Sequence, residues 1–263
     1  MQLPLFHVDA FSDRPFHGNP AAVCFLDFWL DDGALRKVAA ENNLSATAFV
    51  LSKEGSPNLR WFTPLREIRL CGHATLAAAH IIFTVLRSSL EEVSFSTRFS
   101  GGITARKVGG RVAMDFPAFV PQLCALPAQL VPALGLQKTQ FEVLEANDTY
   151  IAVFDSPETI AAIRPDFTLL EQLHPHAVIV TAPGQNSDFV SRYFAPSYGV
   201  PEDPVTGSAH CSLAPYWSNR LNKPRLHARQ LSERGGELWC ELAGERVILT
   251  GDAIVTMKGT LTV

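Results

Sequence analysis

Short runs in which apolar and polar residues alternate recur along nearly the whole chain of 263 residues. Alternation with a period of two predicts a β-strand with one buried face, and Gly, Asn and Pro typically mark where strands end. Strands are therefore expected to outnumber helices. The predicted strands are LPLFHVDAF, AAVCFLDF, TAFVLS, LRWFTP, EVSFST, ITARKV, RVAMDF, FEVLEA, TYIAVFD, HAVIVTA, DFVSRYFA, LHARQLS, GELWCEL, ERVILTG and AIVTMKGTLTV.

Three segments have helical rather than strand-like spacing. DDGALRKVAAENN begins with two aspartates that can cap a helix and then places Leu35, Val38 and Ala39 on one face. SPETIAAI opens with a serine, a preferred residue at the helix N-cap. Residues 73–86 are apolar on nearly every side, which predicts a helix that is buried all round.

The chain reads as two domains joined near its middle. PAFVPQLCALP, residues 117–127, contains three prolines and is interpreted as a linker. A chain of this length suits two modest domains or one large one, because single cores stop growing near ~250–300 residues. The predicted division is 1–116 for an N-terminal domain and 120–263 for a C-terminal domain, with the last strands able to pack on the first.

The two halves of the chain share a repeated sequence pattern. RWFTP at 60–64 is followed by CGHATLAAAH, and RYFAP at 192–196 is followed by TGSAHCSLAP. The distance from the proline to the glycine is 8 residues in the first copy and 11 in the second. Two linked matches in the same order favour duplicated halves, and two merely similar strand–turn–helix units are the alternative. Aligning the glycines pairs Gly72 with Gly207, Cys71 with Thr206 and His73 with Ser208.

Composition narrows the class of protein. With 47% apolar and 18% charged residues, the chain can bury a full core and is not expected to be disordered. The net charge is −4 and no run of Lys or Arg is present, so no nucleic-acid partner is predicted. The longest apolar stretch, residues 75–86, is too short to span a bilayer, so no membrane partner is predicted.

Cysteine and histidine usage predicts a cytoplasmic protein without a metal. The cysteine count is five, no CxxC pair occurs, and MQLPLFHVDAF lacks the features of a signal peptide. The histidines show no helical ligand pair or Cys/His cluster of the usual kind. A homodimer is the expected assembly, because a chain with many strands presents β edges that can pair.

Each copy of the repeated pattern places a glycine where a predicted strand leads into an apolar helix. The first N–H groups of a helix have no partner within it, and that end is partly positive. Gly72 and Gly207 would let an anion approach the backbone closely. Two such helix starts facing each other across a domain cleft would hold a small carboxylate-bearing substrate, whereas either glycine alone is compatible with a simple tight turn.

Two residues near these turns carry candidate chemistry. Asp203 precedes Pro204, which favours an extended backbone, and it could orient a substrate or transfer a proton. Capping the turn from Thr206 to Ser208 is its alternative role. His73 lies in the first turn of its helix, where positive charge is disfavoured, so a neutral imidazole could exchange a proton or bind substrate. A purely structural histidine is the alternative.

The chain resembles the phenazine-biosynthesis isomerase (PhzF-like) family. The motifs that carry the resemblance are VDAFSDRPFHGNPAAV, ENNLSATAFV, RWFTPLREIRLCGHATLAAAH, EDPVTGSAHCSLAPYW and ARQLSERGGEL, which follow in order over nearly the whole chain. The resemblance implies an α+β, diaminopimelate-epimerase-like fold. In that fold, two pseudo-symmetric domains each wrap a β-barrel-like sheet around a central helix, with the site between them.

The resemblance also implies a reaction. The best-known member isomerises trans-2,3-dihydro-3-hydroxyanthranilate without a cofactor, and a glutamate moves a proton between ring carbons. Carried over by motif, the orienting partners are His73 and Asp203. The substrate-binding positions are Gly72, Gly207 and Ser208, and Asn19 flanks the pocket. Related racemases use two cysteines, but Thr206 occupies the second cysteine position here, so a two-thiol racemase is disfavoured.

The family's glutamate position is Ala46 in this chain, within NLSAT. Losing a positioned general base costs typically ~10²–10⁴ in rate. Three interpretations stay open: altered chemistry in which Asp203, Glu202 or His73 serves instead, an inactive relative that only binds, or a substitution introduced at this position. Two hypotheses about function follow, namely an isomerase acting by proton transfer on a small carboxylate, and a catalytically inactive ligand-binding or protein-interaction protein of the same fold.

Overall fold

The computed structural model describes residues 1–52, 56–138 and 141–263, which form two compact units. The first unit contains Met1–Phe116 and Ile248–Val263, and the second contains Pro117–Val247. The predicted division placed 120–263 in the second domain and allowed the last strands to pack on the first. Ile248–Val263 belong to the first unit, because β18 (Ala253–Thr262) pairs antiparallel with β1 (Gln2–Ala10) from one end of β1 to the other.

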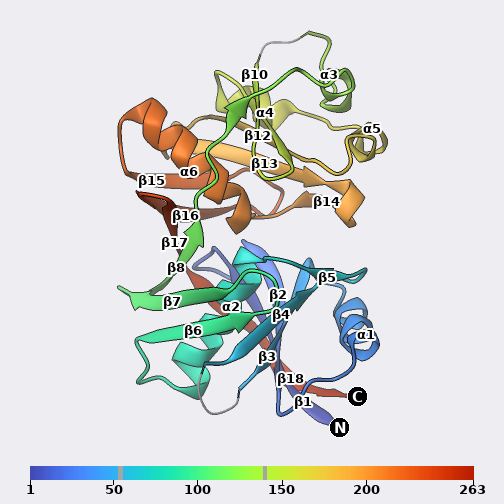
Figure 1. Cartoon of the computed structure of the whole chain (residues 1–263), viewed down its shortest axis with the longest axis vertical. Coiled ribbons are helices and arrows are strands. Elements are labelled where there is room, and N and C mark those ends of the chain that lie inside the picture. Colours follow the sequence, from blue (N-terminus) through green and yellow to red (C-terminus); the bar gives the residue numbers. More distant parts are fainter. Residues whose placement is uncertain (53–55, 139–140) are drawn as a thin grey trace. The chain divides into compact units, whose positions relative to one another are not determined.

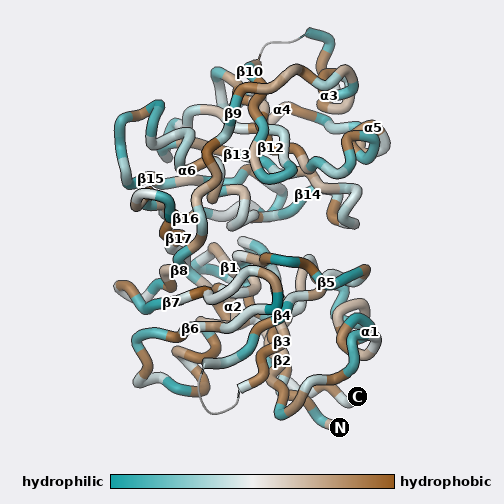
Figure 2. The backbone as a smooth tube through the Cα atoms, in the orientation of Figure 1, coloured by the Kyte–Doolittle hydropathy of each residue, from teal (hydrophilic) through white to brown (hydrophobic). Residues whose placement is uncertain are grey.

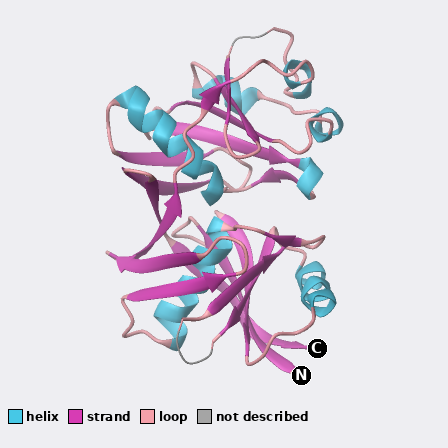
Figure 3. Ribbon diagram, viewed as in Figure 1, coloured by secondary structure: helices cyan, strands magenta, loops and turns pink. Residues whose placement is uncertain are grey.

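Strands dominate the first unit (Figure 3). β1 pairs with β18 and β2, β2 runs parallel to β3, and the ladder continues through β4, β6, β7 and β8. The further strands are β2 (Asn19–Leu26), β3 (Ala46–Leu51), β4 (Asn58–Phe62), β5 (Glu67–Ile68), β6 (Glu92–Thr97), β7 (Gly102–Val108) and β8 (Arg111–Pro117). The helices are α1 (Asp32–Asn42) and α2 (Gly72–Ile81), and a π-helical turn, Ile82–Leu86, continues α2.

The first three strands are buried on both faces. One face forms a core cluster with α1, consisting of Leu3, Leu5, Ala22, Cys24, Leu26, Leu35, Val38, Ala39, Phe49, Leu51 and Phe62. Because side chains alternate along a strand, Asn19, Ala21, Ala46 and Ala48 lie on the opposite face, against which α2 packs. Figure 1 shows α2 within the strands of this unit, and Figure 2 shows hydrophobic residues along β2 and β3.

The second unit repeats this plan around a longer helix. β11 runs parallel to β12, β12 pairs antiparallel with β13, and β13 is bordered by β14 and β15. Its strands are β9 (Gln122–Leu123), β10 (Glu142–Glu145), β11 (Thr149–Val153), β12 (Ala177–Pro183), β13 (Phe189–Ala195), β14 (Val200–Asp203), β15 (Arg225–Gln230) and β16 (Gly236–Ala243). β17 (Arg246–Gly251) begins in the second unit and ends in the first. Its helices are α3 (Leu130–Ala133), α4 (Pro157–Ala162), α5 (Phe167–Glu171) and α6 (Gly207–Leu221), with a 3-10 turn at Pro196–Tyr198.

The repeated sequence pattern corresponds to an equivalent pair of strands in each unit, β4 with β5 and β13 with β14. Arg60 on β4 binds Glu67 seven residues later, and Arg192 on β13 binds Glu202 ten residues later. The three extra residues lie after β13, in the segment that contains the 3-10 turn, and they account for the unequal spacing. The register agrees as well: Trp61 faces Ile68 and Phe62 faces Glu67, as Tyr193 faces Asp203 and Phe194 faces Glu202.

Local signals placed most elements correctly. Asp31 caps α1 by accepting a hydrogen bond from Ala34 N, and Ser156 caps α4 through Thr159 N. The predicted linker at 117–127 contains the two-residue strand β9, and the predicted helix over 73–86 divides into α2 and the π-helical turn. Among the described residues, none of the helices is long and apolar enough to cross a membrane.

Candidate functional site

A ring of polar side chains surrounds the start of α2 in the first unit. Ser45 Oγ donates to Asn19 Oδ1 at 2.6 Å and lies 3.2 Å from His73 Nε2. Asn19 Nδ2 lies 3.2 Å from His73 Nδ1. Asn19 begins β2, Ser45 directly precedes β3, and His73 is the second residue of α2. Three segments that are distant in sequence therefore converge on one imidazole.

Burial keeps this imidazole neutral. His73 is 6% exposed, and burial lowers its pKa from 6.5 to about 3. In a neutral imidazole one nitrogen donates and the other accepts. The ring is satisfied when Asn19 Nδ2 donates to Nδ1, Nε2 donates to Ser45 Oγ, and Ser45 Oγ donates to Asn19 Oδ1. The sequence predicted a neutral His73 from the helix dipole, but the dominant physical cause is desolvation.

Cys71 lies at the N-cap of α2 and completes the surroundings of His73. Its Sγ is 3.5 Å from His73 Nδ1, and its carbonyl accepts from Thr75 Oγ1 at 2.6 Å. The thiol makes no capping hydrogen bond, and Gly72 is the first residue of the helix. The predicted residues Asn19, Gly72 and His73 are thus brought together, whereas their role in binding substrate stays a prediction.

Ala46 follows Ser45 and is the first residue of β3. It is 0% exposed and lies on the face of the strand against which α2 packs. A side chain at this position starts next to the hydroxyl that contacts His73. The position that the resemblance assigns to the family's glutamate therefore directly follows Ser45 in the chain, and that assignment stays a prediction. Its predicted exposure to a substrate cleft stays a prediction.

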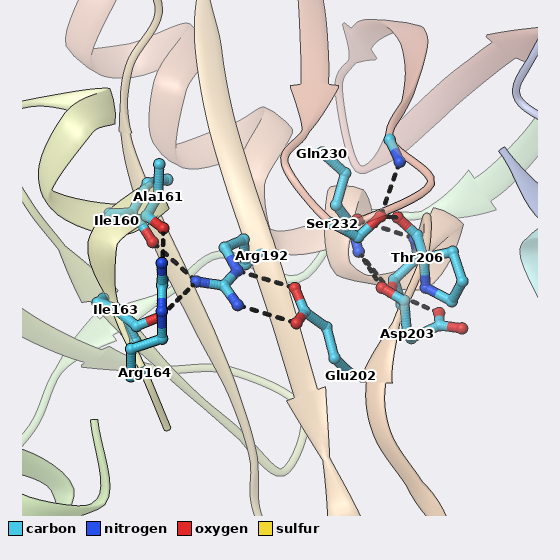
Figure 4. A network of polar contacts seen from close by, with 12 residues as sticks. Ile160, Ala161, Ile163, Arg164, Arg192, Glu202, Asp203, Thr206, Gln230 and Ser232 are labelled. Carbon is cyan, nitrogen blue, oxygen red and sulfur yellow. Dashed lines mark hydrogen bonds and ion pairs between the residues drawn. The ribbon is translucent and has the colours of Figure 1, made fainter. Parts of the chain in front are cut away.

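In the second unit, Asp203 ends β14 and is 8% exposed. Its Oδ2 accepts from Thr206 Oγ1 at 2.5 Å. Gln230, from the end of β15, accepts from Thr206 N at 2.9 Å and donates to the Asp203 carbonyl at 2.6 Å (Figure 4). Asp203 therefore has the predicted extended backbone, and its carboxylate accepts from the hydroxyl of Thr206, the N-cap of α6.

Glu202 points to a different partner. Its two carboxylate oxygens accept from Arg192 Nε at 2.8 Å and Nη2 at 2.9 Å (Figure 4). Arg192 also donates through Nη1 to the carbonyls of Ile160 at 3.0 Å and Ile163 at 2.9 Å. This forked pair joins β13, β14 and the end of α4, so Glu202 and Asp203 are neighbours in sequence with separate environments.

The start of α6 carries the remaining predicted residues. Thr206 is the N-cap, and Gly207 and Ser208 are the first two residues of the helix. One turn later, His210 Nδ1 donates to the Thr206 carbonyl at 2.8 Å. Burial lowers the pKa of His210 to about 4. Gly207, Ser208 and Asp203 therefore lie within one short segment, as predicted, while Asn19, Gly72 and His73 lie in the other unit.

Sequence reasoning missed two of the polar groups that define these surroundings. Ser45 was not among the predicted site residues, although its hydroxyl contacts both Asn19 and His73. Gln230 was not predicted either, although its amide makes three hydrogen bonds to Asp203 and Thr206. The signal for Ser45 was its position directly before the family's glutamate, in the same motif.

Comparisons with known proteins identify relatives over the whole chain. Residues 8–259 match the family model described as phenazine biosynthesis-like protein. An uncharacterized isomerase of Pseudomonas aeruginosa is 53% identical over 261 residues, covering 99% of each chain. The crystal structure of a PhzF-family phenazine biosynthesis protein from Enterococcus faecalis matches with a TM-score of 0.94 at 43% identity, covering 100% of each chain.

The fold extends to more distant enzymes. A hydroxyproline epimerase from Agrobacterium vitis matches with a TM-score of 0.66 at 11% identity, covering 99% of this chain and 92% of that one. At this identity the likeness shows the fold alone. Together with the closer match from Enterococcus faecalis, it confirms the predicted α+β, epimerase-like architecture.

Proposed function

Because the chain belongs to the family of phenazine biosynthesis-like proteins, we propose that it is a cofactor-independent isomerase of a small carboxylate-bearing substrate. In such a reaction a base removes a proton from one carbon, the double bond moves, and the proton is returned to another carbon. Ala46 cannot supply the base. The candidates that remain are Glu202, His73 and Asp203, and their surroundings differ enough to choose among them.

Glu202 is the weakest candidate. Both of its oxygens accept from Arg192, whose side chain is only 10% exposed. A carboxylate held in a forked pair by a guanidinium has its lone pairs engaged in hydrogen bonds. Taking up a proton would break this pair, so Glu202 serves the fold rather than proton transfer.

His73 is suited to binding rather than to removing a proton from carbon. Its protonated form is disfavoured, because burial holds its pKa near 3. An imidazole of such low basicity removes a proton from carbon poorly at neutral pH. A neutral ring held by Asn19 and Ser45 can still exchange one of these hydrogen bonds for a substrate oxygen.

Asp203 is therefore the proposed base. Among the three candidates, Asp203 is the carboxylate that accepts from the hydroxyl of Thr206, the N-cap of α6. This observation carries the proposal, because it joins the carboxylate to the helix start whose N–H groups would hold the carboxylate of a substrate. Gly207 and Ser208 are the proposed carboxylate-binding positions, since the first N–H groups of a helix favour anions.

The test is uptake of solvent deuterium into cyclic and amino-acid-like carboxylic acids, followed by NMR. We expect the natural chain to exchange a carbon-bound proton and Asp203→Asn to lose at least about 10²-fold in rate. Asp188→Asn is the matched control, because Asp188 is an ion-paired carboxylate of the same unit, bound to Lys223. It should exchange at the natural rate.

Ala46→Glu separates the remaining outcomes. Exchange gained only in this variant would show that the natural chain lacks a working base, which contradicts the role assigned to Asp203. Absence of exchange in both forms, with folding verified by circular dichroism, would contradict the isomerase proposal. In that case, binding of the same acids measured by calorimetry would support the ligand-binding alternative that Ala46 motivates.

A further inference from the structure

The hairpin between β15 and β16 holds the segment that carries Asp203. Gln230 is 1% exposed, and its amide contacts three groups of this segment: Thr206 N, the Asp203 carbonyl and Thr206 Oγ1, the last at 3.3 Å. Ser232 Oγ donates to the Pro204 carbonyl at 2.7 Å and accepts from Gly235 N at 3.0 Å. The short connection between β14 and α6 is therefore held by side chains of the hairpin (Figure 4).

Comparison with the first unit shows which of these contacts occur in both units. There, Ser100 Oγ from the hairpin between β6 and β7 donates to the Arg69 carbonyl at 2.7 Å. Arg69 follows Glu67 by the same number of residues as Pro204 follows Glu202, so the two serines make equivalent contacts. A serine that holds the turn before the central helix is thus common to both units, as a structural device of the fold.

Gln230 has no such counterpart. β4 pairs with β6 as β13 pairs with β15, and the register places Thr97 at the position of Gln230. The hydroxyl of Thr97 bonds within its own turn, donating to the carbonyl of Gly101 and accepting from Ser100 N. The residue equivalent to Asp203 is Ile68, which has no carboxylate to orient. The buried amide is therefore found in the unit that contains the acidic group.

We infer that Gln230 is a positioning residue that sets the basicity and orientation of the Asp203 carboxylate through the Thr206 hydroxyl. Gln230 Nε2 donates to Thr206 Oγ1, so the hydroxyl keeps its own proton for Asp203 Oδ2. A hydroxyl that both accepts and donates in this way has one favoured orientation. The catalytic meaning of this inference rests on the proposed role of Asp203 as the base.

The charges around Asp203 identify what else could affect its titration. Tyr193 lies opposite Asp203 in the strand register, and the pKa of its phenol is raised by burial and further by the charge of Asp203. On α6, His210 faces the Thr206 carbonyl and is neutral because burial lowers its pKa. On β13 and β14, Arg192 and Glu202 bind each other.

The decisive variant is Gln230→Glu, which keeps the shape and reverses the polarity of the two contacts that Nε2 makes, to the Asp203 carbonyl and to Thr206 Oγ1. A glutamate oxygen beside Thr206 would compete for the hydroxyl proton and bring a like charge toward Asp203. Both effects raise the pKa of Asp203. We expect an increase of about 1 unit or more, measured by carbon-13 NMR of labelled aspartate with the Asp203 signal assigned through Asp203→Asn. The acid limb of the exchange rate should move by the same amount.

Ser232→Ala is the matched control from the same hairpin. It removes the bond to the Pro204 carbonyl and leaves the hydrogen bonds of Gln230 in place, so it should lower stability without moving the pKa of Asp203. Thr206→Val should also raise this pKa, whereas Thr206→Ser should preserve it. These two variants test the hydroxyl even if Gln230→Glu does not fold.

Two results would overturn the inference. The first is an Asp203 pKa that is the same in Gln230→Glu, or in Thr206→Val, as in the natural chain. The second is an equal shift in Ser232→Ala, which would indicate a general structural effect. The NMR titration needs no substrate, so a failed isomerase proposal, seen as absent deuterium exchange in every form, leaves this test intact.

Discussion

His210 provides a measurable link between burial and acid stability. It is 0% exposed, its Nδ1 donates to the Thr206 carbonyl, and its Nε2 has no hydrogen-bond partner among the described residues. Burial lowers its pKa from 6.5 to about 4, with the bond to Thr206 acting weakly in the opposite direction. Protonation is therefore much easier in the unfolded chain than in the folded one.

The sign follows from proton binding. Below pH 6.5 the unfolded state takes up a proton that the folded state refuses until about pH 4, so stability falls as the pH is lowered through this window. One pKa unit corresponds to about 1.4 kcal/mol. At pH 5, which is 1.5 units below the unfolded pKa, His210 therefore destabilises the fold by about 2 kcal/mol. Above pH 6.5 this contribution disappears.

We predict that His210→Met removes this contribution. Met is flexible enough to fill the space beside Phe189, and it carries no titrating group. The stability lost between pH 7 and pH 5 should be smaller than in the natural chain by about 2 kcal/mol. In urea unfolding followed by tryptophan fluorescence, this corresponds to a midpoint difference at pH 5 of roughly 1 M, for a slope of about 2 kcal/mol per molar.

His17→Gln is the control for loss of a histidine, because its ring contact with the Pro15 carbonyl is exposed. It should leave the difference between pH 7 and pH 5 unchanged. A natural chain and a His210→Met variant that lose the same stability between these pH values would refute the reasoning. It would mean that His210 is protonated in the folded state as readily as in water.

Two further variants test the networks of each unit. Ser45→Ala leaves the Nε2–H of His73 without its acceptor, so we expect the free energy of unfolding to fall by about 1–3 kcal/mol. The nitrogen-15 shifts of the imidazole should also show a mixture of tautomers. Unchanged shifts would contradict the hydrogen bonds proposed between Ser45, Asn19 and His73. Arg192→Met leaves Glu202 and the carbonyls of Ile160 and Ile163 without their donor and should cost about 3–5 kcal/mol in urea unfolding. Arg60→Met should cost less, because Arg60 binds the carboxylates of Glu67 and of the exposed Asp32, whereas Arg192 also satisfies two backbone carbonyls; equal losses in the two variants would contradict this ranking.

Local patterns were sufficient to predict most of the elements. Alternation places β1, β2 and β12 correctly, because each strand buries alternate or all of its residues whatever its neighbours are. The caps Asp31 and Ser156 act through bonds to residues three positions away. The pairing of β18 with β1 is harder to predict in detail from the sequence. It joins residues at opposite ends of the chain and depends on which strand edges are free.

For the candidate site too, local sequence features predict some of the residues but not the contacts between distant segments. His73, Asp203 and the two helix-start glycines stand out because turn chemistry and motif spacing are local properties of the sequence. Ser45 reaches His73 across 28 residues, and Gln230 reaches Asp203 across 27. Such contacts depend on the register in which β2 pairs with β3 and β13 pairs with β15. The periodicity within one strand contains no information on how that strand is aligned with its neighbour.

The sequence by itself thus indicated the α+β class and the repeated strand–turn–helix unit, whereas the assignment of the family's acidic position to Ala46 stays a prediction. Only the tertiary structure decided which partners each candidate carboxylate has. Glu202 and Asp203 are adjacent carboxylates, but successive side chains of a strand point to opposite faces. One face offers Glu202 the guanidinium of Arg192, and the other offers Asp203 the hydroxyl of Thr206. The difference in their chemistry arises from these partners.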